Sequence, residues 1–518
     1  MIKDSIRRYV TEALNSIDIE ISDVFVDAIN KNNGDYYTNV AMVYAKSIGK
    51  NPKDIASEIV EILEKKHSDV FAKVEMAGPG FINFYLTDGV IESALSEVEK
   101  PLHILKNNKI NIEFISANPT GSLHIGHGRG AFYGDVLSNI LEFAGATVIR
   151  EFYINDSKES AQIKELGKTA LGKGEQYKTE ELSGKMENID FSGMGEGEAG
   201  FILAKAVQED NKNFVENKLG IKFDVWYSED ERLRESGLAE QTLESLRDKD
   251  LVYEKDGALW IKTSQFGDDE DRVVVRSDGS MTYFVSDIAY HSDKFGRGYD
   301  KVVDVWGADH HGHVKRMRAV HDMLGWKKEL LIFITQLVTL REGGEVKKFS
   351  KRAGNVILLE DLALEVGVDA LRWFFLEKSL NTHMEFDLAL ARERSSKNPV
   401  YYVQYAHARI SSILNKIKDL SGDKSSLADI VKSDRGKRLA LKIVQFSDVV
   451  EDIAVNYQTH KLLTYVYELA SEFSQFYRDV KVVKEDNFGS GAVELISMAK
   501  RVVAKSLSLL GISAPEKM

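Results

Sequence analysis

The 518-residue sequence contains no cysteine. Without thiols, the chain can form no disulfide, hold no cysteine-ligated zinc and use no thiolate nucleophile. It has only six prolines, and they form no proline-rich linker. No stretch approaches the roughly 18 uncharged apolar residues of a membrane-spanning helix, and the first residues lack the apolar core of an export signal. We therefore expect a cytoplasmic protein without a membrane contact.

Size and charge narrow the class further. A chain of this length with 43% apolar residues predicts two to four domains, each with its own core. The net charge of −13 disfavours a nucleic-acid partner when taken as a sum. Between Arg392 and Lys418, however, six basic residues and three interleaved tyrosines accompany a single acid, Glu393. Such a stretch can follow a nucleic-acid strand and stack on its bases, or it can be the solvated face of an amphipathic helix.

Hydrophobic periodicity divides the chain into three regions. Residues 1–90 combine helical periodicity with a strand-like run at 81–86, which predicts a small α+β domain. From about 105 to 390, strands expected at 109–116, 146–155, 301–306 and 330–339 alternate with helices such as 130–143. This alternation predicts an α/β, doubly wound, Rossmann-like parallel sheet.

The remaining segments have different patterns. A charged stretch at about 157–255, with clustered glycines, is interpreted as an insertion into the α/β region and shows no recognisable chemistry. Beyond residue 391 the pattern is helical, with long periodic runs at 400–417, 438–455 and 461–480. These runs predict an all-helical bundle at 391–518.

Two histidines mark the most informative motif. Residues 117–127 read Ala-Asn-Pro-Thr-Gly-Ser-Leu-His-Ile-Gly-His and lie between the first expected strand and the following helix. His124 and His127 therefore fall at a helix N-terminus, where unpaired N–H groups favour an anion. Gly126 would let a flat ligand approach the backbone. The site suits a nucleotide phosphate, although one such motif alone also fits a packed polar turn.

A second, basic motif follows at 346–356, Val-Lys-Lys-Phe-Ser-Lys-Arg-Ala-Gly-Asn-Val. Its lysines suit a leaving pyrophosphate, and the alternative is a solvated basic loop. Together the two motifs resemble the HIGH and KMSKS signatures of class I aminoacyl-tRNA synthetases, with Phe349 where the second signature usually has Met. The segments 117–121, 306–311, 369–372 and 514–518 narrow the resemblance to the arginyl-tRNA synthetases.

The resemblance implies a function and a domain layout. It implies ATP-dependent activation of L-arginine to arginyl-adenylate and transfer to the 3′ adenosine of tRNA(Arg), with Mg²⁺ accompanying ATP and no zinc. Residues 1–90 would bind the tRNA elbow, 105–390 would be catalytic and 391–518 would bind the anticodon. We expect a monomer. The alternatives are another class I synthetase or a non-catalytic tRNA-binding descendant; the cysteine-ligated zinc of the cysteinyl enzyme has no ligands here.

Residue roles carry over where the motifs match. The catalytic candidates are His124, His127, Lys351 and Lys348, which would stabilise the α-phosphate and the departing pyrophosphate. The ATP-binding candidates are Gly126, Gly307, Asp309, His310 and Ser350. Zinc binding by the Asp309–His313 cluster is the less favoured reading, and His311 and His313 stay unassigned.

The cationic substrate and the tRNA have their own candidates. A guanidinium prefers carboxylates in a planar arrangement and an aromatic wall. The arginine-binding candidates are Glu113, Asn118, Tyr283 and Asp287. Alternatively, Glu113 pairs with a lysine and Tyr283 lies in a core. The tRNA-binding candidates are Phe81, Asn83, Tyr402, Arg409, Tyr477 and Met518, of which Tyr402 and Tyr477 equally suit helix packing.

Overall fold

The computed structural model describes residues 2–21, 23–29, 33–343, 345–347 and 357–518. Its contacts divide the chain into two compact units. The first comprises residues 1–102, 395–508 and 513–518, and the second comprises residues 103–394 and 509–512.

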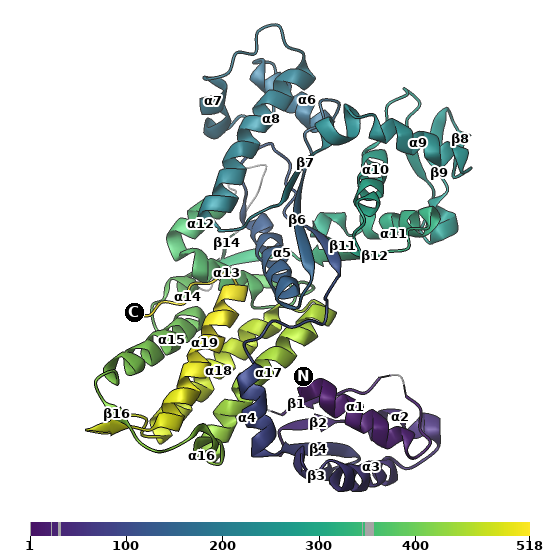
Figure 1. The fold of residues 1–518 in the computed structure, drawn as a ribbon. Helices are drawn as coiled ribbons and strands as arrows, with labels where there is room; N and C mark the ends of the chain where they lie inside the picture. The colour runs from purple at the N-terminus through teal and green to yellow at the C-terminus, as the bar shows by residue number, and fades with distance from the viewer. Residues whose placement is uncertain (1, 22, 30–32, 344, 348–356) are drawn as a thin grey trace. The chain divides into compact units, whose positions relative to one another are not determined.

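A five-stranded parallel sheet forms the centre of the second unit (Figure 1). Its strands are β5 (Lys109–Glu113), β6 (Thr147–Ile154), β7 (Val225–Ser228), β11 (Lys301–Gly307) and β12 (Glu329–Thr335). They follow the order β12-β11-β5-β6-β7, and every neighbouring pair is parallel. The strand order reverses between β5 and β11, which is where doubly wound sheets bind ligands. The predicted fold class is confirmed.

Helices connect these strands, as parallel pairing requires. They include α5 (Ile125–Phe143) between β5 and β6, α10 (Tyr283–Gly296) before β11, and α11 (His313–Leu324) between β11 and β12. On the far side of the basic motif the chain continues through α12 (Leu359–Val366), α13 (Val368–Leu376) and α14 (Leu388–Arg392).

Two of the expected strands end earlier than predicted. The strand expected at 109–116 stops at Glu113, because Ile115 and Ser116 have left-handed φ angles of 71° and 40° that no strand accommodates. The strand expected at 330–339 is two strands. β12 ends at Thr335, and β13 (Val338–Glu342) belongs to a separate sheet with β14 (Glu345–Lys347) and β15 (Met384–Asp387).

The stretch 157–255 is not simply an insertion. Its strand β7 is the edge of the central sheet. Only α6 (Ala161–Ala170), α7 (Glu180–Met186) and α8 (Glu196–Asn213) share a small core of their own. There α6 and α8 meet at two glycines: a Cβ on Gly167 would lie 1.7 Å from the Glu196 carbonyl oxygen, and one on Gly200 would lie 1.9 Å from that of Ile163. Close helix packing therefore explains part of the glycine cluster.

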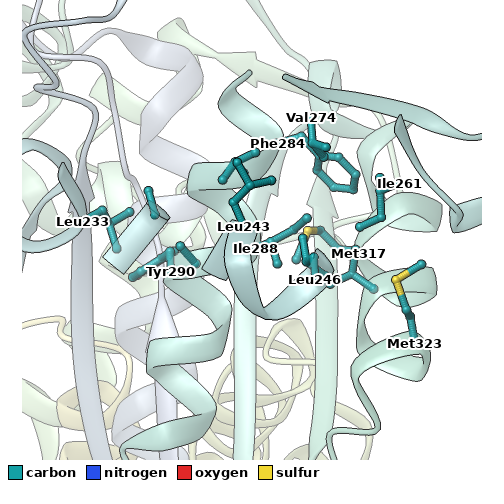
Figure 2. Packing of buried hydrophobic residues seen from close by; sticks show 14 of the residues in the cluster. Leu233, Leu243, Leu246, Ile261, Val274, Phe284, Ile288, Tyr290, Met317 and Met323 are labelled. Carbon is teal, nitrogen blue, oxygen red and sulfur yellow. The ribbon is translucent and has the colours of Figure 1, made fainter. Parts of the chain in front are cut away.

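A hydrophobic core fixes α10 beside the central sheet (Figure 2). It joins α10 and α11 to α9 (Leu238–Asp248) and to the antiparallel strands β8 (Val252–Lys255), β9 (Ala258–Ile261) and β10 (Arg272–Val275). Phe284 and Ile288 of α10 lie in this core with Met317 of α11. The apolar face of α10 is therefore buried, and its register is fixed.

The start of the first unit is a four-stranded antiparallel sheet with helices. The strands β1 (Asp27–Ala28), β2 (Tyr36–Thr38), β4 (Phe81–Leu86) and β3 (Phe71–Ala77) pair in that order. The helices are α1 (Ile2–Asn15), α2 (Val40–Ile48), α3 (Pro52–Lys66) and α4 (Asp88–Glu97). This agrees with the α+β architecture expected for that region.

The rest of the first unit is almost entirely helical. Its helices are α15 (Pro399–Lys416), α16 (Leu427–Val431), α17 (Asp434–Asn456), α18 (His460–Asp479) and α19 (Ser490–Leu509). Two short strands, β16 (Ser421–Gly422) and β17 (Asn487–Phe488), also pair. No helix in the described part of the chain is long and apolar enough to cross a membrane.

Residues 509–512 belong to the second unit, to which hydrogen bonds join them. Asn139 of α5 donates to the carbonyl of Leu509 over 3.1 Å, and Arg372 of α13 donates to that of Leu510 over 3.2 Å. Arg372 also pairs with Asp135 at 2.7 Å. The segment 369–372, singled out in the sequence, therefore includes a residue that joins Leu510 to α5 and α13.

Candidate active site

A cavity of about 720 Å³ lies where β5, β6 and β11 end. Its walls come from the loop after β5, from α10, from the end of β11 and from the start of α11. This is the crevice that the strand order predicts. Its carboxylates are Glu113, Glu229, Asp287 and Asp309. The cavity is thus equipped to hold a cation.

The two motif histidines cap α5. His124 is the N-cap residue, and its Nδ1 accepts a hydrogen bond from the Gly126 amide at 3.1 Å. His127 Nδ1 accepts one from the His124 amide at 3.0 Å, which completes a capping box. Because Nδ1 accepts in both neutral rings, Nε2 carries the proton in both. The motif therefore presents two imidazole donors at a helix N-terminus.

Gly126 has a structural role in this arrangement. A Cβ at this position would lie 2.9 Å from Cε1 of His124, so only glycine lets the ring fold back onto its own helix. Of the two histidines, His127 lines the cavity. The two rings lie together, with centroids 3.9 Å apart.

The histidine motif is hydrogen-bonded to residues just downstream of the basic motif. The Ile125 amide donates to the Ile357 carbonyl at 3.0 Å, and the Leu359 amide donates to the Leu123 carbonyl at 2.9 Å. Residues 357–359, which directly follow the basic motif in the sequence, therefore pair with the histidine motif. Lys348, Ser350 and Lys351 lie outside the described residues.

Tyr283 and Asp287 both line the cavity, as their spacing on one face of α10 predicted. Tyr283 is 47% exposed, so it is not a core residue, and its hydroxyl accepts a hydrogen bond from the Ala161 amide at 3.2 Å. Asp287 Oδ2 lies 2.8 Å from Nε2 of His313. His313, which had no role assigned from the sequence, therefore contacts a residue that is predicted to bind arginine.

Glu113 lines the cavity and also has protein partners. Its carboxylate accepts hydrogen bonds from Lys294 Nζ at 2.5 Å and from Ser116 Oγ at 2.8 Å. The alternative of a lysine partner is thus observed. Burial raises the pKa of Glu113, against the lowering effect of Lys294. A carboxylate has about four lone-pair sites, so it can still accept a hydrogen bond from a ligand.

Glu113 belongs to a buried network of charged side chains. Lys294 Nζ donates to Asp304 Oδ1 at 2.7 Å, and Nε2 of His291 lies 2.9 Å from Asp304 Oδ2. Nδ1 of His291 lies 2.7 Å from the carbonyl oxygen of Asp287. Both partners of His291 only accept, so the ring is an imidazolium. Burial lowers the pKa of His291, but Asp304 outweighs this and raises it.

Glu229 is a cavity residue that the sequence reasoning missed. It directly follows β7, is 1% exposed and accepts a hydrogen bond from Ser286 Oγ at 2.8 Å. Burial raises its pKa. The short run Val225–Ser228 could have been predicted to be a strand. Its carboxyl end, and therefore Glu229, would then be expected at the crevice.

The remaining candidates divide by position. Asn118, Gly307, Asp309 and His310 line the same cavity, while His311 does not. Among the described residues no group of three side chains is arranged to hold a metal ion.

The tRNA candidates lie in the first unit. On β4, Asn83 is 7% exposed, whereas Phe81 is half-buried and its ring lies 6.0 Å from that of Tyr37. Phe81 is therefore the more accessible of the two. Met518 is 51% exposed.

Two tRNA candidates from different helices meet. The guanidinium of Arg409 on α15 lies 4.7 Å from the ring centroid of Tyr477 on α18. Tyr402 also faces α18, because its hydroxyl donates to Ser474 Oγ at 3.3 Å. These side chains of α15 therefore contribute to the packing against α18, while Arg409 stays exposed to solvent.

Comparison with known proteins identifies the family. The protein-family model described as "tRNA synthetases class I (R), catalytic domain" matches residues 90–160 and 176–411. The model "Arginyl tRNA synthetase N terminal domain" matches residues 2–86, and "DALR anticodon binding domain" matches 403–518. The sheet and the histidine motif are those of a class I aminoacyl-tRNA synthetase.

Individual relatives agree with these matches. The arginine–tRNA ligase of Carboxydothermus hydrogenoformans is 41% identical, over 94% of this chain and 93% of that protein. Arginine–tRNA ligase 2 of Bacillus thuringiensis subsp. konkukian is 38% identical, over 100% and 98%. A crystal structure of a putative arginyl-tRNA synthetase from Campylobacter jejuni is 32% identical, with a TM-score of 0.70 over 84% of this chain and 100% of that one. The chain belongs to the arginyl-tRNA synthetase family.

Proposed function

We propose that the protein is an arginine–tRNA ligase. It activates L-arginine with ATP and transfers the arginyl group to the 3′ adenosine of tRNA(Arg). The observation that carries the proposal is the cavity itself, where buried acids lie beside the imidazole of a class I histidine motif. The 41% and 38% identity to arginine–tRNA ligases over nearly whole chains supports the same substrate.

The first reaction needs no side-chain nucleophile. An oxygen of the arginine carboxylate attacks the α-phosphorus of ATP, the bond to the bridging oxygen breaks, and arginyl-adenylate and pyrophosphate form. His124 and His127 donate from Nε2 to the α-phosphate oxygens as charge develops. Lys351 and Lys348 of the basic motif stabilise the pyrophosphate. The pairing of residues 123–125 with 357–359 supports joint action of the two motifs.

Recognition of arginine follows from the acids of the cavity. Asp287 and Glu229 are the ligands of the guanidinium, with Tyr283 as its wall. Glu113, the last residue of β5, and Asn118, in the loop after it, hold the amino or carboxylate end of arginine. Lysine presents a point charge on a longer flexible stem and cannot match a planar, two-carboxylate arrangement.

ATP occupies the part of the cavity near the end of β11. Gly126 and Ser350 belong to the two phosphate-binding motifs, and Gly307, Asp309 and His310 adjoin the ribose and adenine. Mg²⁺ enters with the triphosphate, since this ion is usually held through substrate phosphates and few protein groups. It would neutralise phosphate charge.

The second reaction transfers the arginyl group. A ribose hydroxyl of the terminal adenosine attacks the adenylate carbonyl, and AMP leaves. We assign residues 1–90 to the tRNA elbow, 105–390 to catalysis and 391–518 to the anticodon. Phe81, Asn83, Tyr402, Arg409, Tyr477 and Met518 are the proposed contacts. The protein acts as a monomer in the cytoplasm.

Pyrophosphate exchange tests this function. The wild-type protein is assayed with each amino acid in turn, with and without tRNA(Arg). We expect exchange with arginine alone. Exchange with a different amino acid would assign the chain to another class I synthetase. Absence of exchange with every amino acid, together with retained tRNA binding, would identify a non-catalytic descendant.

A further inference from the structure

We propose that His313 is a positioning residue that sets the specificity for arginine, acting through Asp287. The proposal rests on the proposed function and extends it to a histidine that has no assigned role. Nε2 of His313 lies 2.8 Å from Oδ2 of Asp287. The carboxylate can only accept, so the imidazole donates.

The surroundings of His313 hold its ring in one orientation. It is the first residue of α11, and its side chain is 19% exposed. The ring lies 5.7 Å from the ring of Trp306 and edge-on to Phe284 at 5.6 Å. Because α10 and α11 share one core, the donor and the carboxylate are carried by elements that are fixed to each other.

This contact determines what Asp287 offers to a ligand. With Oδ2 held by His313, the plane of the carboxylate is fixed and Oδ1 has a defined direction. A guanidinium needs such a direction, because its N–H groups form a rigid planar fork. The ammonium of lysine is a rotating point charge and gains little from it. The contact therefore favours arginine over lysine, beyond the negative charge alone.

Three variants separate this role from a merely structural one. His313→Ala removes the donor, His313→Gln keeps an N–H donor, and His311→Ala is the matched control. His311 is exposed and does not line the cavity. Circular dichroism and thermal melting confirm folding of each variant. Pyrophosphate exchange by the wild-type protein with arginine tests the proposed function separately. A failure of the ligase assignment can therefore be distinguished from a failure of the role proposed for His313.

The test measures KM for arginine and for ATP by pyrophosphate exchange with tRNA(Arg) present. We expect His313→Ala to raise the arginine KM about tenfold, to leave the ATP KM unchanged and to narrow the preference for arginine over lysine. His313→Gln should restore most of the wild-type arginine KM, because it keeps an N–H donor. Equal losses for both substrates, an unchanged preference, or no rescue by His313→Gln would overturn the proposal.

Discussion

The guanidinium of Arg409 lies 4.7 Å from the ring centroid of Tyr477, so that the helices α15 and α18 share a cation–π contact. Arg409 is exposed. The contact orders a long side chain that would otherwise be mobile, and it leaves the remaining N–H groups of the guanidinium available to phosphate or bases.

Arg409→Gln is therefore expected to weaken tRNA(Arg) binding while arginine activation stays at the wild-type level. Because one phosphate contact is lost, the slope of log affinity against log salt should fall by about one. Filter binding over a range of salt concentrations measures both. Lys249→Gln, an exposed lysine outside the proposed contacts, controls for the change in net charge. Unchanged tRNA affinity in Arg409→Gln would remove this residue from the interface.

His127→Ala should lower kcat for activation by about 10²- to 10³-fold, as loss of a donor that acts in the transition state does elsewhere. It also removes the cap on the His124 amide, at a cost of roughly 0.5–2 kcal/mol in stability. His127→Glu separates the two effects, since glutamate at this position completes an ordinary capping box but has no N–H donor. We expect normal stability with low kcat, measured by thermal melting and exchange. Full activity in His127→Glu would contradict the donor role.

Lys294→Met leaves Glu113 and Asp304 buried together without their shared cation. Removal of one partner from a buried pair costs about 3–5 kcal/mol, measured here by urea unfolding. The pKa of Glu113 is already raised by burial and would rise further, so the folded state binds more protons than the unfolded state. The loss of unfolding free energy in Lys294→Met, relative to the wild type, should then become smaller as the pH falls from 8 to 5. A deficit that grows on acidification would contradict this reading, and Lys294→Arg is the charge-conserving control.

Glu451 on α17 gives a second pH dependence, in the first unit. Burial, followed by the nearby Asp4 carboxylate, raises the pKa of Glu451 to about 7. Its folded-state pKa thus exceeds the unfolded value near 4.5, so stability falls as the pH rises from about 4.5 to 7 and then levels off. Glu451→Gln should flatten this part of the stability curve, followed by urea unfolding at several pH values. The same slope in the variant would assign the titration to other groups.

The sequence was informative where local signals and periodicity agree. The strand expected at 81–86 is β4 with those bounds, and the helix expected at 130–143 lies within α5. Tyr283 and Asp287 share a cavity because the spacing of a helix is fixed.

Longer-range features were not predictable from local pattern. β7 has four residues inside a charged stretch, and its place at the edge of the sheet depends on pairing with β6, far back in the sequence. Glu229 could not be distinguished from its acidic neighbours until that strand was placed. The contact of His313 with Asp287 likewise depends on how α10 and α11 pack, which periodicity does not specify.

Calorimetric titration of Asp287→Asn with arginine and with ATP tests the central claim most directly. The substitution leaves a guanidinium partly unpaired, where charge-assisted hydrogen bonds contribute roughly 1.5–3 kcal/mol. We predict that arginine binding weakens by about that amount, that ATP binding is unchanged, and that lysine binds poorly to the wild-type protein. Equal weakening of arginine and ATP, or wild-type binding of lysine as tight as that of arginine, would contradict the assignment of this cavity to arginine.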